Sequence, residues 1–309
     1  MSKTQSQRLA YGEELVALGY ENKDIVVLEA DLGKSTMSNL FQQEFPERYF
    51  EMGIAEQDMI STAAGLAVSG KIAFCNSFAV FAAGRPYDQI RQTVSVGKLN
   101  VKICGSSAGL SDFGDGSSHQ AVEDVAIMSA IPNMTVLTPC DAEETRQCVR
   151  AAVEIHGPVY IRTMRNDLPD LLPEGAKFRL GEPRVLREGT DTVVFAHGTM
   201  TGKAMEAAEA LELEGISVKV VNLCTMKPFP YEAVAKLAGG MKAAVTAEEH
   251  TYIGGLASQT ALALRKSKVP MDYVAINDSF GQSAQGPEEL LEYYGLTKEA
   301  IINKVKEFL

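Results

Sequence analysis

The stretch KDIVVLEAD, residues 23–31, is a short run of β-branched and aliphatic residues between charged ones. Such a run is typical of a β-strand. Similar runs recur along the chain and alternate with amphipathic patterns of helical period, which predicts an α/β fold whose mostly parallel sheets are wrapped by helices. In the first half of the chain these runs are KIAFCNSF (71–78), NVKICGSS (100–107), MTVLTP (134–139) and GPVYIRT (157–163).

A segment with several prolines, NDLPDLLPEGAKFRLGEP at residues 166–183, interrupts this alternation and shows little helical or strand period. We interpret it as a crossover between two α/β domains. The expected boundaries are residues 1–170 for the first domain, 171–185 for a linker and 186–309 for the second domain. The strands predicted in the second domain are DTVVFAHG (191–198), SVKVVNLCT (217–225), AAVTAEEH (243–250) and MDYVAIND (271–278).

The composition is that of an acidic globular protein. The chain has 309 residues, a net charge of −11 and a pI near 5.0. It has no cluster of Lys and Arg of the kind that follows a phosphate backbone, so nucleic acid is not an expected partner. No apolar run approaches the roughly 18 residues of a membrane span, and the N-terminal stretch lacks the apolar core of a signal peptide. We expect a cytoplasmic protein that does not bind membranes.

The cysteines also argue for a reducing compartment. There are five of them, an odd number, and none has CxxC spacing. This pattern disfavours both a disulfide framework and a zinc site, and it predicts reduced thiols. They are Cys75, Cys104, Cys140, Cys148 and Cys224.

Polar clusters follow four of the predicted strands of the first domain. They are ADLGKS (30–35), NSF (76–78), GSSAGLSDFGDGSSHQ (105–120) and RTMR (162–165). In open α/β sheets, ligands bind at the carboxyl ends of the strands. The sequence therefore predicts the functional site in the first domain.

Three features of the first predicted domain bear on its chemistry. Glu56, in EMGIAEQDM (51–59), is a carboxylate among apolar residues in a segment that enters a buried helix. His119 lies in a Gly/Ser-rich loop, which suggests a functional histidine, although a structural one remains an alternative. Phe78 and Phe81 have the i, i+3 spacing of one helical face, and taken alone they indicate ordinary core packing. His156, His197 and His250 are not expected to act in catalysis.

Taken together, EMGIAEQDM, SFAVFAAGRPYDQIR (77–91) and SDFGDGSSHQAVEDVAIMSAIPNMTVLTPCDAEE (111–144) closely resemble the pyrimidine-binding domain of transketolases and deoxyxylulose-phosphate synthases. The resemblance continues through VVNLCTMKPF (220–229) and VTAEEHTYIGG (245–255) into the C-terminal domain of that family. Nothing in the chain resembles the N-terminal domain that holds the cofactor diphosphate. The chain is thus similar to the C-terminal subunit of a split transketolase.

The resemblance implies thiamine diphosphate as cofactor. Glu56 matches the glutamate that hydrogen-bonds N1′ of the aminopyrimidine, and burial of a carboxyl group favours sharing a proton with such a ring nitrogen. Phe78 and Phe81 match the aromatic residues that flank this ring. Leu32 matches the apolar wedge that bends the cofactor, and Asp31 matches an aspartate close to the thiazolium.

The same resemblance assigns substrate contacts. Asp115 and His119 match residues that bind the sugar hydroxyls, with His119 as a candidate proton carrier. Arg165 matches the arginine that binds the substrate phosphate, and Ser35 is placed on the same rim. One position departs from the family: Ser107 stands where transketolases have a histidine and the synthases an arginine. This departure predicts that phosphate is bound more weakly here or with help from the missing subunit, and it leaves the acceptor sugar open.

The GDG triplet at residues 114–116 invites a further comparison. In thiamine-diphosphate enzymes, GDG followed about 25 to 30 residues later by Asn holds Mg²⁺, but Asn133 and Asn166 have the wrong spacings. We therefore predict no metal ligand in this chain and expect a partner, an N-terminal transketolase subunit, to supply the Mg²⁺ and diphosphate site.

The function expected from the resemblance is transfer of a two-carbon ketol unit from a ketose or ketose phosphate to an aldose or aldose phosphate. The second domain is expected to serve in homodimer contacts, within a heterotetramer. Two alternatives remain open at this point. One is a deoxyxylulose-phosphate synthase-like or ketoacid dehydrogenase beta-like subunit, and the other is a non-catalytic regulatory homologue.

Overall fold

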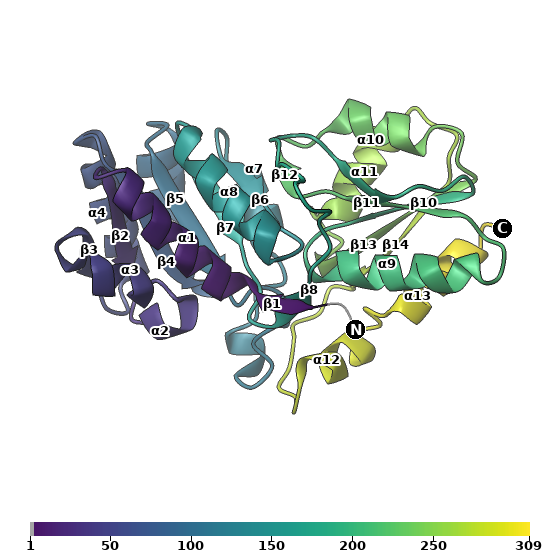
Figure 1. Cartoon of the computed structure of the whole chain (residues 1–309), viewed down its shortest axis with the longest axis horizontal. Helices are drawn as coiled ribbons and strands as arrows, with labels where there is room; N and C mark the ends of the chain where they lie inside the picture. Colours follow the sequence, from purple (N-terminus) through teal and green to yellow (C-terminus); the bar gives the residue numbers. More distant parts are fainter. Residues whose placement is uncertain (1–2) are drawn as a thin grey trace.

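The structure, a computed structural model, describes residues 3–309. Figure 1 shows two α/β lobes side by side, the first coloured purple to teal and the second green to yellow. The first lobe is built on a seven-stranded sheet of order β12-β6-β7-β5-β4-β2-β3, and the second on a five-stranded sheet of order β14-β13-β10-β11-β9. This confirms the predicted fold class of two α/β domains with mostly parallel sheets.

In the first sheet every pair is parallel except the edge pair of β12 with β6. The central strands are buried along their whole length, as expected for parallel strands covered on both faces. The strands of this sheet are β2 (Ile25–Glu29), β3 (Tyr49–Glu51), β4 (Ile72–Phe78), β5 (Val101–Ser106), β6 (Thr135–Leu137), β7 (Val159–Arg162) and β12 (Thr225–Lys227).

The alternation of side chains along β2 explains the two cores of this lobe. Ile25 and Val27 face a cluster formed with α1 (Gln7–Glu21) and α8 (Ala142–Glu154), whereas Val26 and Leu28 face α4 (Glu56–Val68) on the other side. The smaller helices of this lobe are α2 (Gly33–Thr36), α3 (Asn39–Glu44), α5 (Ala79–Gly84), α6 (Tyr87–Gln89) and α7 (Asp124–Ala130), together with the short 3₁₀ helices η1 (Pro46–Arg48) and η3 (Gly116–Ser118) and the π-helix η2 (Ile90–Ser95).

The second sheet is parallel except for its edge strand β9, which runs antiparallel to β11. Its strands are β9 (Arg184–Arg187), β10 (Thr192–Ala196), β11 (Val218–Asn222), β13 (Ala243–Thr251) and β14 (Met271–Ile276). Its helices are α9 (Thr199–Glu212), α10 (Tyr231–Ala238), α11 (Leu256–Leu264), α12 (Pro287–Tyr293) and α13 (Lys298–Lys306).

Every strand predicted from the sequence is present, and five short ones were missed. They are β3, β9, β12 and the isolated pair of β1 (Thr4–Ser6) with β8 (Asp167–Pro169). Strand β8 lies inside the segment predicted to have little strand period. Strand β12 comes from the C-terminal half of the chain but completes the first sheet, so the two lobes share a sheet edge.

All five cysteines are buried free thiols, as predicted, and Sγ of Cys148 lies 3.3 Å from Sγ of Cys224. Within residues 3–309, no helix is long and apolar enough to cross a membrane.

Candidate active site

The four predicted polar clusters follow β2, β4, β5 and β7, which are consecutive neighbours in the parallel sheet. Because parallel strands end at the same edge of a sheet, the four loops meet there. The candidate site lies at this edge.

Glu56 is the first residue of α4 and is only 4% exposed. It borders an open cavity of about 620 Å³ that is otherwise lined by its neighbours Ile54, Ala55, Gln57 and Asp58, and by Arg85. A carboxylate in the first turn of a helix interacts favourably with the helix dipole. The cavity therefore presents a fixed, buried carboxylate beside solvent.

The expectation that Glu56 has purely apolar surroundings is wrong. Arg85 donates from Nη1 to Oε1 of Glu56 at 2.6 Å. The same guanidinium lies 3.9 Å from the centre of the Phe81 ring, in cation–π contact. Arg85 follows Phe81 by four residues, and this spacing places both side chains on one face of a helical segment. That spacing was the signal that could have identified Arg85.

Phe78, Phe81 and His119 lie close together. Phe78 is the last residue of β4 and Phe81 lies in α5, and their rings are nearly parallel with centres 6.2 Å apart. His119 follows the short turn η3, and its ring meets Phe81 edge-on with centres 5.1 Å apart. Ser118 Oγ lies 2.9 Å from His119 Nδ1 and holds the imidazole in place. The imidazole of His119 thus packs edge-on against Phe78 and Phe81.

Asp31 and Leu32 lie in the turn after β2. The φ angle of Asp31 is 61°, a left-handed conformation that is costly for a residue with a side chain. Glu51 stabilises this turn, because its Oε1 accepts hydrogen bonds from the backbone N of Asp31 at 2.8 Å and of Gly53 at 3.1 Å. One carboxylate oxygen therefore ties the Asp31–Leu32 turn to the segment that leads into Glu56.

Arg165 lies with a second arginine that the sequence analysis missed. Arg8, in α1, donates from Nη1 to the backbone oxygen of Ser35 at 2.7 Å. Burial, and then the charge of Arg165, lower the pKa of Arg8. Two guanidinium groups close enough to repel each other, beside Ser35, form a candidate anion site.

Ser107, the position that departs from the family pattern, is completely buried, and its Oγ has no hydrogen-bond partner within the described part of the chain. Its φ angle of 51° marks the sharp turn at the end of β5. It contributes no charge to the anion site.

The second lobe holds the loop that carries His119. Glu249 Oε1 accepts from the backbone N of Leu110 at 2.6 Å, Gln120 donates to the backbone oxygen of Gln282 at 3.1 Å, and the N of Ala284 donates to Phe113 at 2.9 Å. The second lobe therefore positions the substrate loop of the first.

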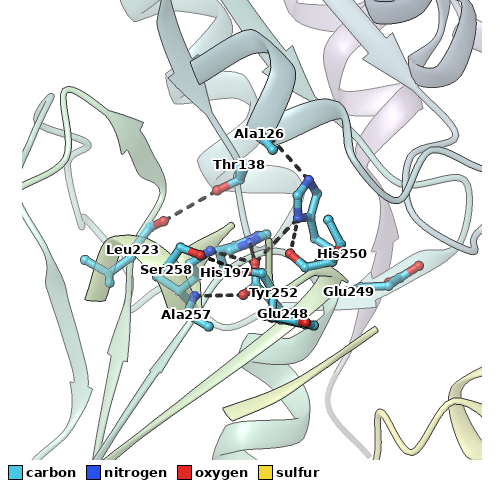
Figure 2. Close-up of polar contacts among 12 residues, drawn as sticks. Ala126, Thr138, His197, Leu223, Glu248, Glu249, His250, Tyr252, Ala257 and Ser258 are labelled. Carbon is cyan, nitrogen blue, oxygen red and sulfur yellow. Dashed lines mark hydrogen bonds and ion pairs between the residues drawn. The ribbon is translucent and has the colours of Figure 1, made fainter. Parts of the chain in front are cut away.

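Figure 2 shows polar contacts of the second lobe together with two that reach the first lobe, from Ala126 to His250 and from Thr138 to Leu223. Glu248 accepts hydrogen bonds from the backbone N of Leu256 and Ala257 at the start of α11, at 2.7 and 2.8 Å. The backbone N of Ala126, in the first lobe, donates to Nε2 of His250 at 3.4 Å. His197 is completely buried, and burial lowers its pKa to about 3. His197 and His250 thus lie at the lobe junction, away from the Glu56 cavity.

No set of three or more His, Cys, Asp or Glu side chains within residues 3–309 could hold a metal ion.

Two family models match the chain: "Transketolase, pyrimidine binding domain" over residues 3–170 and "Transketolase, C-terminal domain" over residues 181–301. The chain belongs to the transketolase family. It is 42% identical to a putative transketolase C-terminal section from Methanocaldococcus jannaschii, over 98% of this chain and 96% of that protein. It is 41% identical to a 6-deoxy-6-sulfo-D-fructose transketolase subunit from Clostridium sp. (strain MSTE9), over 94% and 91% of the two chains.

A solved structure described as a split gene transketolase, inactive beta4 tetramer, superposes with a TM-score of 0.89 at 46% identity and covers 99% of both chains. The domain composition of this transketolase-family chain is therefore that of the C-terminal subunit of a split transketolase. Its pyrimidine-binding domain implies dependence on thiamine diphosphate.

Proposed function

We propose that this chain is the cofactor-activating subunit of a two-chain transketolase that transfers a two-carbon ketol unit between sugars. The observation that carries the proposal is the cavity at the start of α4. There a buried carboxylate, Glu56, pairs with Arg85, and the same guanidinium covers Phe81, whose ring packs with those of Phe78 and His119. An aromatic face can stack on a flat heterocycle, and a carboxyl group can hydrogen-bond its ring nitrogen.

The residues present fit the aminopyrimidine end of thiamine diphosphate. Phe78 and Phe81 would flank the ring, Glu56 would hydrogen-bond its N1′ atom, and the turn of Asp31 and Leu32 would support the bent conformation. Bound thiamine diphosphate supplies the nucleophilic carbon needed to cleave a bond next to a ketose carbonyl. The residues of this chain would orient the reacting groups and hold protons for that chemistry.

The remaining groups serve the sugar. His119, held through Nδ1 by Ser118, has its other ring nitrogen free of that contact and can carry a proton to or from a sugar hydroxyl. Asp115, at the start of the η3 turn, is exposed and can accept from hydroxyl groups. Arg8 and Arg165 would bind a terminal anion of the sugar.

The partner of this chain is proposed to be an N-terminal transketolase subunit that supplies the Mg²⁺ and diphosphate ligands. Two observations support this. The described residues contain no cluster that could hold a metal, and the solved relative that consists of beta chains alone is described as inactive. We further propose that the two kinds of chain form a heterotetramer with homodimer contacts through the second lobe. Its proposed location is the cytoplasm.

The substrate class is a ketose donor and an aldose acceptor, either of which can carry a terminal anion. One relative acts on a sugar sulfonate, 6-deoxy-6-sulfo-D-fructose, so the anion is not restricted to phosphate within the family.

Glu56→Gln tests the proposal in the assembled enzyme. Because the amide cannot share a proton with N1′, turnover should fall by roughly 10² to 10⁴ while assembly is retained. Glu47→Gln is the matched control, since Glu47 is exposed and lies in the same lobe. The measurements are kcat and the C2 proton exchange rate of bound cofactor. Near-normal values of both in Glu56→Gln would show that Glu56 is a structural carboxylate.

A further inference from the structure

Asp112 lies in the loop between β5 and η3 and is only 2% exposed. Its Oδ2 accepts from Nη1 of Arg165 at 2.9 Å. The loop around it is fixed at two further points: Ser111 Oγ accepts from the backbone N of Arg165 at 3.2 Å, and Gln120 donates to the backbone oxygen of Asp112 at 3.1 Å. Asp112 is thus a buried carboxylate held against one of the two arginines of the candidate anion site.

This carboxylate changes the charge of the site. Arg8 and Arg165 contribute two positive charges, and ionised Asp112 offsets one of them, while the charge of Asp167 also acts on Arg8 and that of Asp115 on Asp112. The influence of Asp112 reaches both arginines, since its charge also acts to raise the pKa of Arg8. Ser107, completely buried and uncharged, does not restore the missing positive charge.

We propose that Asp112 sets the charge preference of the anion site, so that the site favours sugars with a singly charged terminal group, such as a sulfonate, over sugars with a doubly charged phosphate. This inference rests on the proposed function, which places the terminal anion of the sugar at Arg8 and Arg165. A sulfonate carries one negative charge, whereas a phosphate monoester carries about 1.5 to 2 near pH 7.

The electrostatic origin of the effect gives it a signature. A Coulomb energy is proportional to the product of the two charges, so Asp112 penalises a dianion about twice as strongly as a monoanion. Neutralising Asp112 should raise the association constant of a monoanion by some factor, and that of a dianion by about the square of this factor. A mere change of loop structure would alter both affinities by similar factors.

The test measures binding of methanesulfonate and inorganic phosphate to the isolated chain at about pH 8, where phosphate is mainly a dianion. Binding is followed by NMR of the arginine side-chain Nε–H groups. Asp112→Asn should tighten methanesulfonate about threefold and phosphate roughly tenfold. Asp112→Ser should also tighten phosphate more than methanesulfonate, which would show that the effect does not depend on the asparagine side chain. Asp112→Glu, which keeps the charge, should remain close to wild type, and Arg165→Ala should weaken both anions.

Equal gains for the two anions in Asp112→Asn, or weaker binding of both, would overturn the proposal. Absence of binding of either anion to the wild type and to Asp112→Asn would overturn it as well, because the site would then not bind anions. The measurement needs neither cofactor nor partner chain. Equal gains for the two anions would therefore contradict the proposed role of Asp112, whereas lack of turnover in the assembled enzyme would contradict the proposed function.

Discussion

Arg85 and Glu56 form an ion pair, with Nη1 of Arg85 2.6 Å from Oε1 of Glu56, while the same guanidinium covers the ring of Phe81. Arg85 therefore occupies both groups that the proposed function assigns to the aminopyrimidine ring. Its side chain is 45% exposed, so it can turn toward solvent without opening the core. We infer that binding of the cofactor requires Arg85 to leave this position.

Removal of Arg85 should then strengthen cofactor binding. A half-exposed ion pair is worth at most about 1 kcal/mol, so Arg85→Gln should lower the Kd of thiamine diphosphate in the assembled enzyme about two- to fivefold. Isothermal titration calorimetry measures this change, with Arg91→Gln on the nearby η2 segment as the control. Weaker binding in Arg85→Gln would show that Arg85 contacts the bound cofactor instead of competing with it.

Arg165→Ala should separate charged from uncharged acceptors. Loss of a charge-assisted contact costs about 1.5 to 3 kcal/mol, which corresponds to a roughly ten- to hundredfold rise in KM for a phosphorylated aldose. The KM for glycolaldehyde, which has no terminal anion, should remain nearly unchanged. Arg8→Ala should follow the same pattern, and Arg179→Ala, an exposed arginine, serves as control. An equal rise for both acceptors would mean that Arg165 only supports the loop.

Glu29 should make the protein less stable as the pH rises. It is completely buried in β2, and burial raises its pKa from 4.5 to about 7, even though Thr36, Ser38 and the backbone N of Ala30 donate hydrogen bonds to it. Between these values the folded state keeps a proton that the unfolded state releases. The free energy of unfolding therefore falls as the pH rises through this window, by about 3 kcal/mol in total, and is level above it.

Glu29→Gln removes this titration. Relative to wild type, the variant should gain about 2 to 3 kcal/mol in free energy of unfolding between about pH 5 and about pH 8. Urea unfolding at several pH values measures the difference, with Glu47→Gln as the exposed control. A difference that does not change with pH would show that Glu29 has the same pKa in the folded and unfolded states.

The strands of the fold were predictable because their residues carry the signal themselves. In β2 the unbroken apolar and β-branched run from Ile25 to Leu28 coincides with complete burial. Strand β12 has no such signal, since Thr225, Met226 and Lys227 form a strand only because the edge of β6 accepts them. The pair of β1 with β8 likewise joins segments more than 150 residues apart, and neither has strand character alone.

The residues of the candidate site likewise divide into those with a local sequence signal and those without one. Glu56, Phe78, Phe81 and His119 were identified by local motifs, and the fold brings the aromatic residues and His119 into contact. Arg8 and Asp112 were missed, because their meaning depends on contacts with Arg165 across the sheet edge. A charge preference is a property of several groups together, and no single motif displays it.

The central claim, that this chain supplies one half of a two-chain transketolase, is tested most directly by reconstitution. Ketol transfer to glycolaldehyde is measured with thiamine diphosphate and Mg²⁺ for the purified chain, for the N-terminal transketolase section from the same organism, and for their mixture. Activity should appear only in the mixture and should saturate at equal amounts of the two chains. Appreciable transketolase activity from the pure chain alone, or none from a mixture shown to assemble, would contradict the claim.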